Sequence, residues 1–200
     1  MKRAFALVTA PALAIALAAC GDGKESHGTT GHSASASPSS AQAGPHNDQD
    51  VMFAQMMIPH HRQAVEMADL AAARASSAEV RSLAAQIKRA QAPEIEQLGG
   101  WLKGWGASVP APGTTGMGGM HHGGTSGMMS ERDMKELAAA KGRAFDRAFL
   151  EMMIEHHEGA VAMARTEESA GRSPEARRMA GSIVSSQTAE IAGMRALLKR

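Results

Sequence analysis

The sequence is poor in cysteine and in net charge. A single cysteine among 200 residues excludes an intrachain disulfide framework and any zinc site built on several thiolates. The balance of 21 basic and 20 acidic residues, a formal charge of +1, excludes a broadly basic protein that binds nucleic acid. Motifs for nucleotide binding and nucleophilic catalysis are also missing. We therefore expect no nucleic-acid partner and no organic cofactor, and we assign no catalytic residue.

Aromatic residues are few, with four Phe, two Trp and no Tyr, whereas methionine is abundant, with 15 residues. A core that is short of aromatic rings and rich in thioethers is either soft and helical or built around a group that binds sulfur. The methionines are therefore the first candidates for a binding role.

Long apolar runs are confined to residues 4–19, which follow the positive residues Lys2 and Arg3. This run is shorter than the roughly 20 residues that span a membrane and is typical of a secretory signal peptide, which we place at residues 1–19. It ends in Leu-Ala-Ala-Cys20, which resembles a bacterial lipobox. We expect lipid on Cys20 and a protein that is secreted across the inner membrane and anchored on the extracytoplasmic face of the envelope, in the periplasm or at the cell surface. The alternative is an ordinary cysteine in an uncleaved signal.

The rest of the chain is organised by an internal repeat. Residues 53–68 (FAQMMIPHHRQAVEMA) match residues 149–164 (FLEMMIEHHEGAVAMA) without a gap, and identities continue to Ile95 and Ile191. The chain therefore holds two copies of one unit. Our predicted segments are a disordered tether over 20–47, the first repeat over 48–104, a linker rich in Gly, Met and His over 105–129, and a short helix plus the second repeat over 130–200.

Each repeat reads as two helices joined by a short turn. Apolar residues recur at helical spacing on both sides of Ser77, which is a predicted N-cap, and its counterpart Ser173 precedes Pro174. Ser130 is a predicted cap for the short helix, which ends near Ala140. The sequence predicts an all-α protein: a ferritin-like four-helix bundle made of two repeated antiparallel αα-hairpins.

A polar layer is predicted at one height in each hairpin. On a helical wheel, His60 lies in the middle of the apolar stripe and His61 at its edge, while Gln91 and Glu94 lie on the facing stripe. Both pairs are about 16 residues from the turn, so they are level with each other. The second copy places His156 and His157 level with Gln187 and Glu190 in the same way.

Histidine nitrogen and methionine sulfur at helical spacing suit a soft ion such as Cu(I) or Ag(I) better than Zn(II). In this interpretation Glu94 contacts the second ring nitrogen of a ligand histidine and orients the ring. Gln91, Gln187 and Glu190 are assigned the same supporting role. In the alternative, His60 is a core histidine bonded to Glu94 and the methionines only pack. The candidate metal ligands are Met56, Met57, His60, His61, Met67, Met152, Met153, His156, His157, Met163 and, in the linker, Met117, Met120, His121 and His122.

The doubled Met-Met-x-x-His-His block and the later Gln-x-x-Glu-Ile resemble domain-of-unknown-function family 305, over about residues 48–200. This family comprises ferritin-like, secreted or periplasmic proteins, some tied to copper binding and tolerance. The resemblance implies copper as cofactor, as Cu(I), Cu(II) or Ag(I) in its place. It also makes the histidine pairs and the methionines beside them candidate ligands.

The leading hypothesis is a non-enzymatic lipoprotein that buffers or transfers copper or silver in the envelope. Its expected partners are the metal ion, the membrane through the lipid anchor, and either a second copy in a homodimer or an envelope metal-transfer protein. One alternative is a metal-free helical interaction module whose His–Glu layers are structural. Another is a ferritin-like oxidoreductase, although di-iron bundles use Glu-x-x-His pairs rather than the Gln-x-x-Glu found here.

The lipobox interpretation predicts the effect of Cys20→Ala. Because the thiol is the attachment point, the variant should incorporate no radiolabelled palmitate, whereas the wild type should be labelled. Equal labelling of the two proteins would contradict the anchor.

Overall fold

The computed structural model describes residues 44–113 and 127–200. In these ranges it contains five helices and no strand: α1 (Asp48–Arg74), α2 (Ala78–Gly104), α3 (Glu131–Ala139), α4 (Gly142–Ala170) and α5 (Pro174–Leu197). The prediction of an all-α protein is confirmed. None of these described helices is both long enough and apolar enough to cross a bilayer. The predicted signal peptide, Cys20 and most of the tether lie outside the described residues, as do Met117, Met120, His121 and His122.

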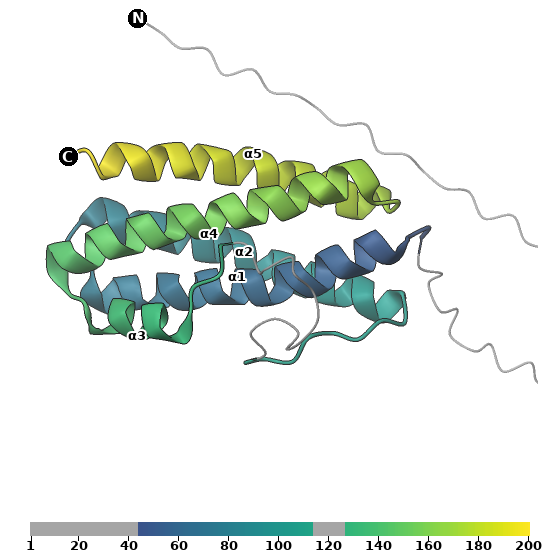
Figure 1. The fold of residues 1–200 in the computed structure, drawn as a ribbon, viewed down its shortest axis with the longest axis horizontal. Coiled ribbons are helices and arrows are strands. Elements are labelled where there is room, and N and C mark those ends of the chain that lie inside the picture. The colour runs from purple at the N-terminus through teal and green to yellow at the C-terminus, as the bar shows by residue number, and fades with distance from the viewer. Residues whose placement is uncertain (1–43, 114–126) are drawn as a thin grey trace, which may run out of the picture. The chain divides into compact units, whose positions relative to one another are not determined.

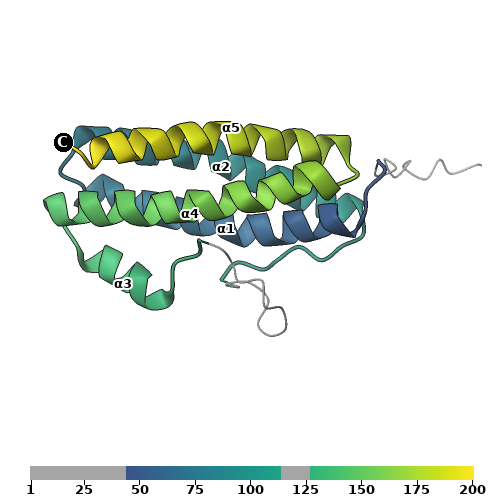
Figure 2. The same cartoon turned by 45° about the horizontal axis from the view of Figure 1, so that its top comes forward.

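The helices form two antiparallel hairpins, α1 with α2 and α4 with α5, which meet through α1 and α4 (Figures 1 and 2). The short α3 lies beside this bundle, against α1 and α4 (Figure 2). The predicted four-helix bundle of repeated hairpins is therefore confirmed. Small side chains allow α1 and α4 to approach closely: Ala64 and Ala68 on α1, and Ala160 and Ala164 on α4, are buried.

The helices begin where the sequence places their caps. The Ser77 side chain accepts a hydrogen bond from the backbone N–H of Val80, and Ser173 precedes Pro174 in the same role for α5. Ser130 forms a capping box with Asp133 at the start of α3. These side chains satisfy N–H groups that the first helical turn leaves open.

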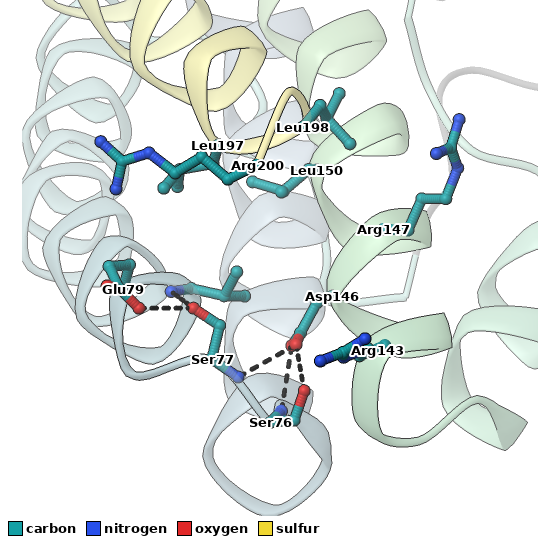
Figure 3. Close-up of a pocket in the computed structure, with 11 residues that line it drawn as sticks. Ser76, Ser77, Glu79, Arg143, Asp146, Arg147, Leu150, Leu197, Leu198 and Arg200 are labelled. Carbon is teal, nitrogen blue, oxygen red and sulfur yellow. Dashed lines mark hydrogen bonds between the residues drawn. The ribbon is translucent and has the colours of Figure 1, made fainter.

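Two aspartates lock each hairpin to the turn of the other. The Asp146 carboxylate of α4 accepts hydrogen bonds from the backbone N–H of Ser76 at 3.0 Å and of Ser77 at 2.9 Å, in the turn between α1 and α2 (Figure 3). Asp50 of α1 accepts from the backbone N–H of Arg172 at 3.0 Å and of Ser173 at 2.8 Å, in the turn between α4 and α5. Since the two aspartates occupy equivalent positions of the repeat, they fix the register of α1 on α4 from both ends.

One of these locks contains a second buried carboxyl group. Glu167 is fully buried beside Asp50, where the first repeat has the apolar Ala71. Burial, and then the hydrogen bond and negative charge of Asp50, raise the pKa of Glu167 to about 8. Asp50 carries the charge of the pair. Although burial raises the pKa of Asp50, hydrogen bonds from Glu167 and from the backbone of Asn47, Ser173 and Arg172 outweigh it, so the pKa is lowered. Glu167 therefore holds a proton at neutral pH.

This pair predicts a pH-dependent stability. The pKa of Glu167 is about 8 in the folded chain against an ordinary value of 4.5, so unfolding releases its proton between these values and the free energy of unfolding falls as pH rises from about 4.5 to 8. Glu167→Gln keeps the shape of the side chain and removes its ionisable carboxyl group. We expect the variant to be more stable than wild type by about 1–3 kcal/mol at pH 8, with a smaller gain at pH 5.

Urea unfolding of both proteins at pH 5, 6, 7 and 8 measures this difference. The matched control is Glu168→Gln, the adjacent carboxyl group, which should show no such trend. A stability difference that is constant across the pH range would show that Glu167 is not protonated in the folded chain.

Candidate metal centre

Four buried histidines meet where α1 crosses α4. We call His60, His61, His156 and His157 the histidine layer; their exposed fractions are 2% for His60 and 0% for the other three. The ring centroids of His60 and His156 are 3.8 Å apart, with the ring planes at 42°. The two copies of the repeat therefore join their histidines in one site, an arrangement that the hairpin geometry of a single copy does not contain.

The other two histidines are each held by a carboxylate of their own hairpin. His61 Nε2 lies 2.7 Å from Glu94 Oε2, and His157 Nε2 lies 2.6 Å from Glu190 Oε2. The prediction of histidine and glutamate at one height is thus supported, but the expected pairing of His60 with Glu94 is wrong. His60 points across the bundle toward α4, whereas His61, about 100° further around α1, points at α2.

The contacts with Glu94 and Glu190 use Nε2 of His61 and His157 and leave Nδ1 of each ring available. A carboxylate oxygen accepts hydrogen bonds, so Nε2 of His61 and His157 donates to it, and in the neutral form of the ring Nδ1 has the free lone pair. Within the part of the chain that the structure describes, neither Nδ1 atom has a hydrogen-bond partner, and neither do the ring nitrogens of His156. Burial, and then the neighbouring His60, hold the pKa of His156 well below its ordinary value. His156 is therefore neutral at pH 7, and a neutral imidazole can bind a metal.

Two glutamines complete the polar layer. Gln91 of α2 and Gln187 of α5 are both 3% exposed. Their side-chain oxygens also lack a hydrogen-bond partner among the described residues. A buried polar atom without a partner costs about 1–3 kcal/mol, so the layer holds several groups whose hydrogen-bonding capacity is unused.

Some of the methionines predicted as ligands lie next to the histidine layer, and others lie far from it. Met57 and Met153 are fully buried, each one helical turn before a histidine pair. Met56 and Met152 are also one turn away but are partly exposed. Met67 and Met163 follow His60 and His156 by seven residues, about 10 Å along the helix, so the structure does not bring them to the layer. Met67 packs in the apolar cluster that contains Phe149.

Sequence reasoning missed two polar residues next to the histidines. Arg62 Nη1 donates to the backbone oxygens of Pro110 at 2.8 Å and Ala111 at 3.1 Å. The Gln63 side chain donates to the backbone oxygen of Met129 at 2.8 Å and accepts from its N–H at 2.7 Å. Both ends of the linker are thus bonded to α1 beside the histidine layer. A signal existed for Gln63, because the second copy has Gly159 at that position.

No three His, Cys, Asp or Glu side chains within residues 44–113 and 127–200 are grouped so that they could hold a metal ion among themselves. Methionine sulfur is not included in that set of side chains. Met57 and Met153 lie one helical turn before the histidine pairs of the layer and could supply sulfur donors.

The DUF305 family model, described as a domain of unknown function, matches residues 50–198. The chain belongs to the DUF305 family. A DUF305 protein from Streptomyces coelicolor, assigned as secreted, is 35% identical with a TM-score of 0.68, over 76% of this chain and 92% of that one. A DUF305 fragment from Deinococcus radiodurans is 35% identical with a TM-score of 0.68, over 78% of this chain and 99% of the fragment.

CopM in its Cu(II)-bound form is 36% identical with a TM-score of 0.64, over 75% of this chain and 95% of CopM. Solved structures of CopM in Cu(I)-bound, Ag-bound and apo forms match as well. No curated protein sequence matches the chain. The resemblance to the DUF305 family and the helical fold expected from it are therefore confirmed.

The His–Glu pairs predict which tautomer is present in this DUF305 protein. In ¹⁵N NMR spectra, His61 and His157 should carry hydrogen on Nε2, because each Nε2 donates to a carboxylate. Glu94→Gln should change the His61 signals and leave those of His157 alone. Glu96→Gln, an exposed carboxylate on the same helix, is the control. An Nε2 atom without hydrogen in the wild type would contradict the geometry.

Proposed function

We propose that this DUF305 protein binds Cu(I), and Ag(I) in its place, inside the bundle at the histidine layer. The nitrogen donors are ring nitrogens of His61, His156 and His157, and the sulfur donors are Met57 and Met153. Since no three of the described His, Cys, Asp or Glu side chains are grouped around one point, a bound ion takes nitrogen from at most two histidines and completes its coordination with sulfur. The observation that carries the proposal is the pair of buried histidines, each held at Nε2 by a carboxylate and without a hydrogen-bond partner at Nδ1 among the described residues.

This arrangement is the one that metal-binding histidines adopt. A ligand histidine donates its second ring N–H to a carboxylate or carbonyl, which fixes the ring and makes the free nitrogen a better donor. Glu94 and Glu190 supply these contacts, one from each hairpin. A histidine that served only packing would gain nothing from a bare nitrogen in an apolar interior, since that atom loses its hydrogen bond to water.

The sulfur atoms favour a soft ion. Thioethers bind Cu(I) and Ag(I) well, whereas they add little for Zn(II) or Mg(II). Methionine also needs no deprotonation, so the sulfur donors stay competent as pH changes. The copper-bound and silver-bound forms of CopM, a relative 36% identical to this chain, support the same class of ion.

The cellular role that fits these features is to buffer copper or pass it on outside the cytoplasm. The secreted relative from Streptomyces coelicolor supports an extracytoplasmic location. Lipid on Cys20 would hold the bundle at a membrane of the envelope, within reach of a metal-transfer partner or of a second copy. The linker residues Met117, Met120, His121 and His122 form a second, weaker donor set in this proposal, because their glycine-rich sequence predicts a larger loss of conformational entropy on binding.

The test is a Cu(I) titration of the full chain against a competing chromophoric chelator. His61→Gln combined with His157→Gln should abolish the bundle site, and Met57→Leu combined with Met153→Leu should weaken it by about tenfold or more. Zn(II) should bind wild type more weakly than Cu(I). Changing Met117 and Met120 to Leu and His121 and His122 to Gln should remove only the weaker set.

A matched control removes two histidines from the tether, His32→Gln with His46→Gln, and should leave the bundle site unchanged. If the His61 and His157 variant keeps the stoichiometry and affinity of wild type, the histidine layer does not bind copper. The metal-free module with structural His–Glu pairs would then be preferred.

A further inference from the structure

A second group of thioethers lies outside the histidine layer. A hollow of about 310 Å³ opens between α3 and α4, and we call it the α3–α4 hollow. Three methionines and three carboxylates line it: Met128, Met129, Met152, Asp133, Glu136 and Glu155. Met128 and Met129 belong to no candidate site considered so far.

The hollow is formed by stripes of two helices that face each other. Met152 and Glu155 lie one turn apart on α4, and Asp133 and Glu136 lie one turn apart on α3. Met129 is only 8% exposed, whereas Met128 and Met152 are half-buried. The sulfur-bearing side chains therefore line the inner part of the hollow, while the exposed Glu136 and Glu155 lie at its opening.

The methionine pair is held rigidly in place. Gln63 bonds both the N–H and the carbonyl oxygen of Met129. Two residues earlier, Gly127 has a φ of 82° and lies against α4. A Cβ atom on it would lie 2.5 Å from the backbone oxygen of Glu155 and 3.1 Å from Cα of His156. Only glycine permits this approach, so the backbone that carries Met128 and Met129 is fixed before binding, which lowers the entropy lost on binding.

The charge around the hollow favours a cation. Its described lining has three carboxylates and no basic side chain. Arg132 stays outside, 3.9 Å from Asp133 and 3.7 Å from Glu136. Asp133 already accepts hydrogen bonds from the N–H and hydroxyl of Ser130. Glu136 is also shared with Arg132, so Glu155 is the lining carboxylate with the most capacity left to attract an ion, and Glu136 adds negative charge beside it.

We propose that the α3–α4 hollow is a separate site for a soft monovalent cation, Cu(I) or Ag(I), bound by the sulfur atoms of Met128, Met129 and Met152. The carboxylates of Glu136 and Glu155 concentrate the ion at the opening, and the thioethers select it over Zn(II) and Ca(II). Met152 precedes His156 by one helical turn, so the hollow is the solvent-facing site beside the histidine layer. The proposal shares its class of ion with the function proposed above but does not need the histidine layer to bind metal.

The experiment follows methionine methyl groups by NMR in the full chain labelled at the methionine methyl carbon. Ag(I) is diamagnetic, so the methyl signal of a bound thioether shifts without being broadened away. As Ag(I) is added up to several equivalents, the signals of Met128, Met129 and Met152 should shift together, at the same equivalent. Met128→Leu with Met152→Leu, which conserves volume, should remove one equivalent of Ag(I) and abolish the shift of Met129.

Two further double variants test whether the methyl shifts come from the α3–α4 hollow. Met52→Leu with Met134→Leu removes two thioethers that do not line the hollow, and should keep all three shifts. Glu136→Gln with Glu155→Gln should weaken Ag(I) binding in the hollow by about 3–10-fold, with a smaller effect at high salt.

The histidine variant separates this site from the one proposed above. His61→Gln with His157→Gln should leave the shifts of Met128, Met129 and Met152 intact, even if the histidine layer proves not to bind metal. The proposal is overturned if these three signals do not shift, if the Met128 and Met152 variant keeps every equivalent of Ag(I), or if the histidine variant abolishes the shifts.

Discussion

The register of α1 on α4 is the constraint on which the rest of the structure depends. Asp50 and Asp146 each reach across to the turn of the other hairpin. Buried alanines let the two helices approach between these locks. With both ends fixed, the rings of His60 and His156 meet 3.8 Å apart. A shift by one helical turn would move one histidine about 5.4 Å along the axis and place it against apolar side chains, which would separate the nitrogen donors of the two copies.

The histidine layer has a cost that its own hydrogen bonds only partly offset. It lies between two apolar clusters, one around Phe145, Phe149 and Met67 and the other around Phe53, Leu98 and Leu102. Glu94 and Glu190 satisfy one nitrogen each, whereas Nδ1 of His61 and His157 and both ring nitrogens of His156 have no hydrogen-bond partner among the described residues. A fully apolar layer of the same volume would be cheaper to bury. The arrangement is easier to understand if stability is reduced here to keep donors ready for a ligand.

The repeat explains the symmetric part of the molecule, and its departures explain the rest. The histidine layer and both aspartate locks use residues that the copies share. Glu167 stands where the first copy has Ala71, and this change adds a buried protonated carboxyl group to one lock only. Gln63 stands where the second copy has Gly159, and it fixes Met129 beside α4. With α3 between the copies, this makes a methionine-lined hollow on one side of the bundle.

The sequence by itself determined the helices, their caps at Ser77, Ser130 and Ser173, and the repeat, because helical periodicity and capping are local properties of the chain. It also placed histidine and glutamate at one height, since height in a hairpin follows from counting residues to the turn. Only the tertiary structure decided that Glu94 bonds His61 rather than His60, that His60 meets His156, and that Met67 lies far from both. Those outcomes depend on how each helix is rotated about its axis and on which hairpin faces which. The packing of side chains around all four helices sets both of these, and no single segment contains that information.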